Sequence, residues 1–201
     1  MDGPEVNFKY HIIQKSRLAA LNLRNIMQFR QYLNVDSCKA LVQALVMSHL
    51  DYSNAVFVDL PTTTLAPAQR VQNFAARVIL GRRRFESATA ALRELHWLPI
   101  AQRCKFKLLL LVYKCLHGQA PKYLSDLLVV HQPRRDTRSA RSEAITLSVP
   151  RTTRSTFAAR SFSVTGPKYW NKLPVDIKKS DSVMSFRKKL KTHLFNENFN
   201  T

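Results

Sequence analysis

The feature that most constrains the fold of this chain is the apolar run LLLLVY at Leu108–Tyr113. It lies in a helical pattern over about 100–116, between Pro99, which disfavours a helix at the residue before it, and Gly118, which can end one in the left-handed conformation. Because no side of this run is polar, other helices must surround it. The run is far shorter than the roughly 20 residues that cross a bilayer. We therefore expect a core helix and no membrane partner.

Helical spacing of apolar residues also precedes this run. It predicts a helix over 6–31, a second helix that Asp36 can cap, and a third that follows the turn at Pro61. Gly81 stands where the third helix should end. This part is expected to be an all-helical bundle. The face of the second helix expected to be buried holds Cys38, Leu41, Val42, Leu45, Val46 and His49.

The sequence pattern of the chain changes after residue 130. Residues 131–165 show little apolar periodicity and hold 7 Arg against Asp136 and Glu143. Short strands fit at 145–149 and 161–164, but most of this segment is expected to be loop.

The C-terminal end returns to helical patterns. Gly166-Pro167 is expected to turn the chain into a short helix holding Tyr169 and Trp170, and Asp181-Ser182 can cap a last amphipathic helix. The apolar face of that helix holds Val183, Phe186, Leu190 and Leu194, and its polar face Arg187, Lys188, Lys189 and Lys191. The sequence therefore predicts a mainly α protein in two parts: a helical bundle over 1–130, and a basic, loop-rich segment with a terminal helix over 131–201.

The formal charge of +19 is unevenly distributed along the chain. Residues 1–80 carry 8 Lys and Arg against 5 Asp and Glu, whereas residues 81–201 carry 24 against 8. Such an excess usually indicates a polyanionic partner, most often nucleic acid. The alternative is a solubilising surface with no fixed partner.

Cysteine usage and the N-terminus indicate the compartment. Cys38, Cys104 and Cys115 are too few and too scattered for a disulfide scaffold, so a reducing environment is expected. Asp2 and Glu5 stand near the N-terminus with no apolar run beside them, which disfavours secretory and mitochondrial targeting. We expect a nuclear or cytoplasmic protein that is not secreted.

The Cys and His spacings do not indicate a metal site or a nucleophile. Cys115 and His117 near Cys104 lack a fourth ligand at a usual spacing, so both cysteines are expected to be core thiols. Cys38 and His49 share a helical face by spacing alone. No metal and no cofactor are expected.

Two tryptophans have both a structural and a functional interpretation. Trp97 could stack on a base or fill the joint before Pro99, and Trp170 has basic neighbours at Lys168 and Lys172. Because each is followed by a Leu-Pro turn, packing in the core is favoured for both.

The hypothesis of nucleic-acid binding rests mainly on the arginines. Their planar guanidinium groups bind phosphates in a bidentate manner, and here they fall in expected loops. Phe157 and Phe162 lie between them and could stack on unpaired bases. The alternative is a solvated basic loop. The candidate nucleic-acid-binding residues are Arg82, Arg83, Arg84, Arg134, Arg135, Arg138, Arg141, Arg151, Arg154, Arg160 and Lys168.

An ordered set of motifs resembles a known family. The longest is LHWLPIAQRCKFKLLLLVYKCLHGQAPKYLSDLL at residues 95–128. The others are LDYSN at 50–54, VQNFAAR at 71–77, VPR at 149–151, ARSFSV at 159–164, GP at 166–167, WNKLP at 170–174 and SFR at 185–187. In this order they resemble the C-terminal part, after the polymerase palm, of reverse transcriptases from non-LTR (LINE-type) retrotransposons.

The resemblance implies a thumb-like helical bundle over 1–130 and a C-terminal segment that contacts nucleic acid. It implies a non-catalytic piece that binds RNA or an RNA–DNA hybrid through the backbone, with little base specificity. Polymerisation by this family uses closely spaced carboxylates that hold two divalent ions. This sequence has no adjacent acidic pair, and Asp51-Tyr52 matches the family's Tyr-x-Asp-Asp hairpin poorly. We therefore expect no enzyme activity.

Three other interpretations stay open. In the first, the chain is a helical protein–protein interaction module that docks its partner on the apolar faces of 71–79 and 183–194. In the second, it is an inactive genomic relic. In the third, it is a polymerase subunit whose palm lies on another chain.

Overall fold

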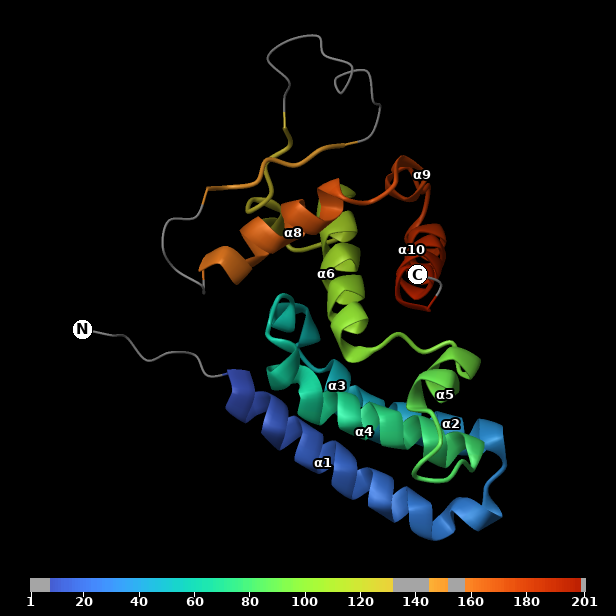
Figure 1. Cartoon of the computed structure of the whole chain (residues 1–201). Coiled ribbons are helices and arrows are strands. Elements are labelled where there is room, and N and C mark those ends of the chain that lie inside the picture. Colours follow the sequence, from blue (N-terminus) through green and yellow to red (C-terminus); the bar gives the residue numbers. More distant parts are fainter. Residues whose placement is uncertain (1–7, 132–144, 152–157, 200–201) are drawn as a thin grey trace, which may run out of the picture. The chain divides into compact units, whose positions relative to one another are not determined.

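The computed structural model describes residues 8–131, 145–151 and 158–199 (Figure 1). Over these residues the chain is mainly α, as predicted, and the extended segments form only an isolated bridge between Val130 and Leu147. No helix in the described ranges combines the length and apolarity needed to cross a membrane.

The chain divides into two compact units, residues 1–104 (unit 1) and 105–201 (unit 2). Helix α6, Ile100–Leu116, continues from the first unit into the second. The boundary proposed at residue 130 follows a change in composition and remains a prediction.

Unit 1 is built from helices packed along one another (Figure 1). Helix α1 contacts α2 and α4, and α4 contacts α5. The stripe predicted on α1 is buried, because Ala19 and Leu23 are fully enclosed and Ile12 and Ile26 nearly so. The helices of this unit are α1 Phe8–Phe29, α2 Val35–Val42, α3 Ser48–Asp51, α4 Thr62–Leu80 and α5 Ala88–Glu94.

The ends of two helices show how local residues set their bounds. Gly81 ends α4 as predicted, at φ 64°, and the next backbone N–H reaches back to the carbonyl of Arg77 at 2.9 Å. The predicted cap at Asp36 is wrong. Asn34 caps α2 instead, since its extended backbone places its side-chain oxygen 2.7 Å from the N–H of Ser37.

The buried face after α2 is narrower than predicted. A π-helical segment, Gln43–Met47, interrupts the regular helix between α2 and α3. Cys38, Val42 and Val46 are fully buried, but Leu41 and Leu45 are 38% and 45% exposed. Those two leucines line an open groove together with residues of α1, so they do not belong to the core.

Unit 2 has its core around α6. Leu108, Leu109 and Val112 are buried, as the apolar run predicts, but Leu110 and Leu111 are only half-buried, so the run is not enclosed on every side. Tyr113 stacks on Phe186 with ring centroids 4.2 Å apart, and its hydroxyl donates to the carbonyl of Ser180 at 2.6 Å. The further helices of this unit are α7 Lys122–Ser125, α8 Phe162–Asn171, α9 Val175–Lys178 and α10 Val183–Phe199.

The strand predicted at 161–164 is wrong, because α8 begins at Phe162 and includes Gly166 and Pro167. Helix α8 packs closely on α6 at Gly166, because a Cβ added to this residue would lie 3.0 Å from a methyl group of Val112. Only glycine lets α8 approach α6 so closely at this point. The turn predicted at Gly166-Pro167 is therefore part of the helix.

The strand predicted at 145–149 is reduced to a single bridge residue, Leu147. The side chain of Asn171 fixes this residue, because its Nδ2 donates to the Leu147 carbonyl at 2.7 Å and its Oδ1 accepts from the Leu147 N–H at 2.9 Å. Backbone bonds from Ser148 to Val129 and from His131 to Thr146, both 2.8 Å, extend the pairing.

Candidate nucleic-acid interface

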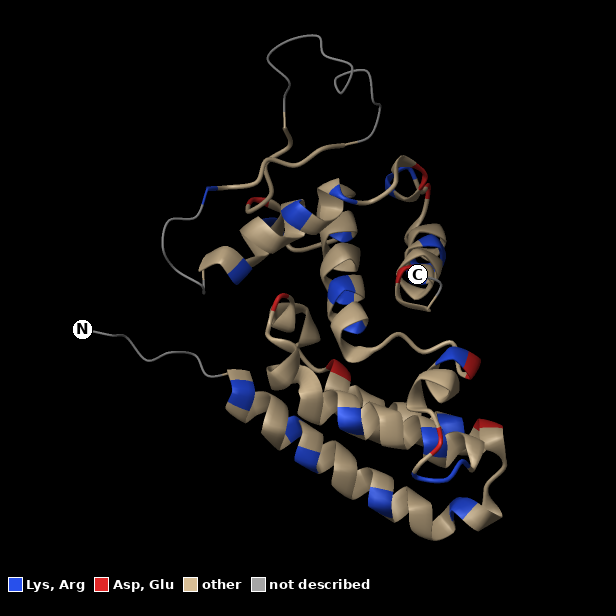
Figure 2. Ribbon diagram, in the orientation of Figure 1, with Lys and Arg blue, Asp and Glu red and all other residues tan. Residues whose placement is uncertain are grey.

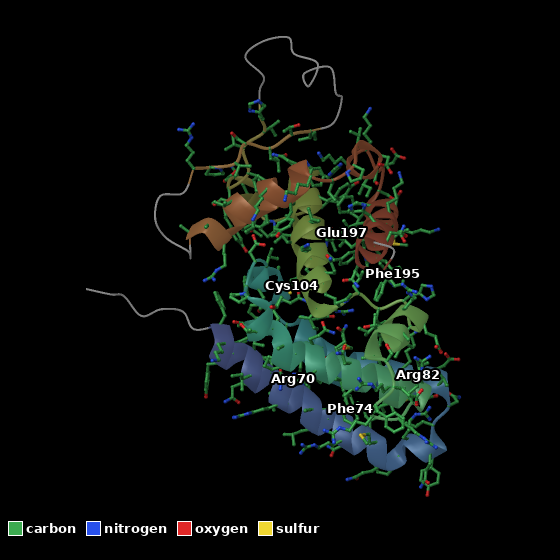
Figure 3. All side chains as sticks on the ribbon, viewed as in Figure 1. Arg70, Phe74, Arg82, Cys104, Phe195 and Glu197 are labelled. Atoms are coloured by element: carbon green, nitrogen blue, oxygen red, sulfur yellow. The ribbon has the colours of Figure 1, made fainter. Side chains whose placement is uncertain are left out.

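The arginines after α4 are held in a network of local bonds. Arg82, which Figure 3 labels, forms an ion pair with Glu94, and the Arg83 N–H donates to the side chain of Glu86 at 2.6 Å. The side chains of Arg83 and Arg84 are exposed. Of these three candidates, Arg82 has a structural role, and Arg83 and Arg84 present their guanidinium groups to solvent.

Arg30, which was not predicted as a functional residue, binds the end of α4, directly before these arginines. Its guanidinium donates to the carbonyls of Val78 at 2.7 Å and Ile79 at 2.9 Å, in the last turn of α4. A cation suits that position because the last carbonyls of a helix carry negative charge. It also donates to the Leu33 carbonyl at 2.8 Å, so it joins the 3-10 turn Arg30–Tyr32, which follows α1, to the end of α4.

The candidates in the C-terminal segment are described only in part. Arg151 is exposed, and Arg160 is half-buried in a 3-10 turn, Ala158–Arg160, before α8. Phe162 is half-buried in α8. The remaining candidates lie outside the described residues: Arg134, Arg135, Arg138, Arg141 and Arg154, with Phe157.

Lys168 belongs to a cluster of three lysines around one tyrosine in unit 2. The Nζ atoms of Lys105 and Lys168 each lie 5.4 Å from the centre of the Tyr169 ring, and that of Lys172 lies 5.9 Å away. Lys168 lies in α8, Lys172 follows directly after that helix as its C-cap residue, and Lys105 comes from α6. We call these four residues the lysine–tyrosine cluster.

Sequence reasoning identified one member of this cluster, Lys168. The i, i+4 spacing of Lys168 and Lys172 is visible in the sequence and is a signal of a shared helical face. Lys105 is more than sixty positions away, so only the packing of α6 and α8 brings it to Tyr169. No sequence pattern would have found it.

Positive charge is concentrated in unit 2, where 19 Lys and Arg stand against 6 Asp and Glu. Figure 2 shows basic positions on α6, α8 and α10. On α10 the cations are exposed, while Phe186 and Leu190 are fully buried, as the predicted amphipathic pattern requires. The exposed basic residues of this helix are Arg187, Lys188, Lys189 and Lys191.

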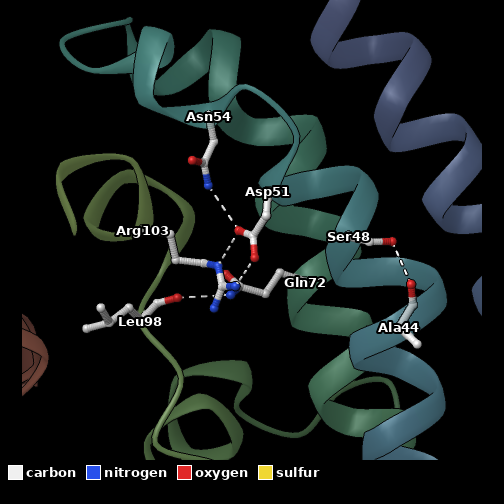
Figure 4. A network of polar contacts seen from close by, with 7 residues as sticks. All are labelled: Ala44, Ser48, Asp51, Asn54, Gln72, Leu98 and Arg103. Atoms are coloured by element: carbon white, nitrogen blue, oxygen red, sulfur yellow. Dashed lines mark hydrogen bonds and ion pairs between the residues drawn. The ribbon is translucent and has the colours of Figure 1, made fainter. Parts of the chain in front are cut away.

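The Asp51 motif forms a structural joint in unit 1 (Figure 4). One oxygen of Asp51 accepts from Arg103 Nε at 2.8 Å and from Asn54 Nδ2 at 3.0 Å, and the other forms an ion pair with Arg103 Nη2. Both charged side chains are about one-fifth exposed. The carboxylate is thus occupied by a guanidinium that α6 supplies.

A second part of this joint involves Gln72, which is fully buried in α4. Its Nε2 donates to the carbonyl of Leu98 at 2.9 Å, and Gln69 Oε1 accepts from the N–H of Ile100 at 2.9 Å. These bonds satisfy the backbone where the Leu-Pro step leads into α6. Three of the motifs behind the family resemblance therefore meet here to hold the fold.

Both tryptophans are core residues, as predicted. Trp97 is 5% exposed and Trp170 is fully buried. The indole N–H of Trp170 donates to the carbonyl of Ile145 at 2.9 Å. Since neither ring face reaches solvent, neither tryptophan is available to stack on a base.

All three cysteines are buried free thiols, as expected for core residues. Burial, and then the nearby Asp51 carboxylate, raise the pKa of Cys104 to about 12 (Figure 3). Burial also raises the pKa of Cys38 and of Cys115. Thiols with raised pKa values stay protonated at neutral pH and are poor nucleophiles. In the described ranges no group of three His, Cys, Asp or Glu side chains is placed to hold a metal ion.

Alkaline pH is expected to destabilise unit 1 through Cys104. A thiol whose pKa is higher in the folded than in the unfolded chain favours folding below the unfolded value of 9.0, and this contribution is lost as pH rises toward about 12. Between about pH 8 and 10 the loss should be about 1.4 kcal/mol in the free energy of unfolding. Urea unfolding at both pH values measures it, with Cys104→Ala as control. If the free energy of unfolding depends equally on pH in the unchanged chain and in Cys104→Ala, the raised pKa of Cys104 is contradicted.

Comparison with protein-family models, with curated proteins and with solved structures finds no match for this chain.

Proposed function

We propose that this chain binds RNA or an RNA–DNA hybrid through phosphate contacts, as a non-catalytic part of a non-LTR retrotransposon-type reverse transcriptase. The ordered motifs that resemble the segment after the polymerase palm support the family. The charge of unit 2 supports a polyanionic ligand.

The observation that carries the proposal is the lysine–tyrosine cluster. Three ammonium groups within 6 Å of one ring centre repel one another, and a ring quadrupole only partly offsets this. A phosphate among them would replace repulsion with charge-assisted hydrogen bonds. A solubilising surface gains nothing from gathering like charges, because dispersed lysines would solubilise as well at less cost.

The basic face of α10 provides further exposed cations within unit 2. Its four exposed cations lie on the side of the helix opposite the buried Phe186 and Leu190. Such contacts recognise the phosphate backbone and carry no sequence information directly. Little base specificity is therefore expected on a hybrid.

Removing the three lysines of the cluster is expected to weaken binding and its salt dependence. In the variant Lys105→Gln/Lys168→Gln/Lys172→Gln, the slope of log affinity against log salt should fall by about two to three for a labelled RNA–DNA hybrid, since each lost phosphate contact removes about 0.9. Fluorescence anisotropy across a salt series measures this.

The matched control is Arg17→Gln/Arg24→Gln/Lys39→Gln, which removes the same charge from α1 and α2 of unit 1. Its slope should stay near that of the unchanged chain. If the salt slope falls equally in both variants, the cluster contributes only through the net charge of the chain, and its assignment as the phosphate-binding site is wrong.

A helical protein-interaction module is the second candidate, and one observation favours it. The faces first expected to dock a partner are buried within the units, for example Ile79 and Leu190. A different apolar surface is open, however: the groove between α1 and α2. It is lined by Asn22, Asn25, Ile26, Phe29, Leu33, Leu41 and Leu45. Apolar docking there would hardly change with salt, which separates it from phosphate binding.

A further inference from the structure

We propose that Tyr169 is a stacking platform for an unpaired base, so that the lysine–tyrosine cluster binds a single-stranded segment of nucleic acid. This rests on the proposed function and specifies the ligand of the same site. It assigns to Tyr169 a role that phosphate binding alone does not require.

The position of the ring supports a recognition role. Tyr169 is half-buried in α8, and the ammonium groups of the exposed Lys168 on its own helix and of Lys105 on α6 each lie 5.4 Å from its ring centre. The next residue, Trp170, is fully buried and bonded to Ile145, so it fixes the helix beneath. The neighbouring aromatic residues therefore have different roles: Trp170 packs in the core and Tyr169 remains at the surface.

The chemistry of the cluster suits a nucleotide better than an isolated phosphate. Lysine side chains are long and flexible, so ammonium groups that rest on the ring can move to phosphates a few ångströms away. Their departure uncovers the ring, and a base can then stack on it while lysines hold the flanking phosphates. Aromatic rings with adjacent cations are the common arrangement in single-strand binding sites.

The strand must be unpaired at this point. In a duplex or hybrid the faces of each base are covered by neighbouring base pairs, so a side chain cannot stack on them without opening the helix. The lysines can hold the backbone of either ligand, but Tyr169 adds affinity for the single strand alone. The two ligands therefore separate the contribution of the ring from that of the charges.

The test compares Tyr169→Leu and Tyr169→Phe in the full chain, with a uridine-rich single-stranded RNA and an RNA–DNA hybrid of equal length. Loss of the ring should weaken single-strand binding about 5- to 150-fold. Hybrid binding should change by less than about twofold. The phenylalanine variant keeps the ring and should bind both ligands as the unchanged chain does.

Equal losses on both ligands, or no loss on the single strand, would overturn the stacking role while leaving phosphate binding intact. If the unchanged chain binds neither ligand at low salt, the proposed function itself fails. A second measurement on the unchanged chain avoids dependence on variant folding. Photocrosslinking to an oligonucleotide with 5-iodouridine should modify the peptide that contains Tyr169, and adducts confined to other peptides would refute the assignment.

Discussion

Leu109→Asp is expected to unfold unit 2. Leu109 is 2% exposed on α6, in a run with no polar side. The substitution removes a buried side chain, which costs about 2–5 kcal/mol, and places a carboxylate where it has no cationic partner. The sum is comparable to the whole stability of a typical domain, about 5–15 kcal/mol. Circular dichroism at 222 nm should show a large loss of helix and of the cooperative melt.

The matched control is Ala101→Asp, which adds the same carboxylate to the exposed first turn of α6. A negative charge is favourable there because the N-terminal end of a helix is positive. The free energy of unfolding of this variant should lie within about 0.5 kcal/mol of that of the unchanged chain. An unchanged melt for Leu109→Asp would place Leu109 outside the core and contradict the fold of unit 2.

Trp170→Ala should lower the free energy of unfolding by about 3–5 kcal/mol. The indole is fully buried beside Phe186, with ring centroids 6.0 Å apart, and it bonds the carbonyl of Ile145. Alanine leaves a large cavity and removes the donor for that carbonyl. Chemical denaturation measures the loss.

Trp170→Phe keeps an aromatic ring but removes the indole N–H and part of the buried ring volume. It should therefore lose less stability than Trp170→Ala, with about 1–3 kcal/mol of the loss from the unsatisfied Ile145 carbonyl. Because Trp170 does not reach the surface, this variant should bind nucleic acid with the same salt slope as the unchanged chain.

The helices were predictable because their signals are local. Apolar spacing of three and four residues identified α1, α6 and α10, and Gly81 and Ser182 marked the end of one helix and the start of another. These signals depend only on neighbours within a turn or two, so the sequence alone contains them.

One error arose where distant residues contribute to the local structure. Residues 161–164 alternate in a way that fits a strand, but the chain forms α8 there, and Gly166 of this helix lies close to Val112 of α6. Asp51, which the sequence analysis did not assign to catalysis, pairs with Arg103 about fifty residues away, and no local pattern indicates that partner.

The candidate site was predicted in charge but only partly in residues. The sequence indicates a cationic C-terminal part, and it identifies Lys168. It does not show that Lys105 and Lys172 lie near the same Tyr169 ring as Lys168, because the position of Lys105 depends on how α6 and α8 pack. Net charge is a sum over residues, whereas a binding site is a geometry.

The salt dependence of binding to an RNA–DNA hybrid tests the central claim most directly. With three phosphate contacts, affinity should fall about 40-fold between 50 and 200 mM salt, along a straight line of slope about −2.7 in logarithmic coordinates. Further contacts from α10 would steepen it. A folded chain that shows no binding at 50 mM salt, or an affinity that does not change with salt, would contradict phosphate binding by unit 2.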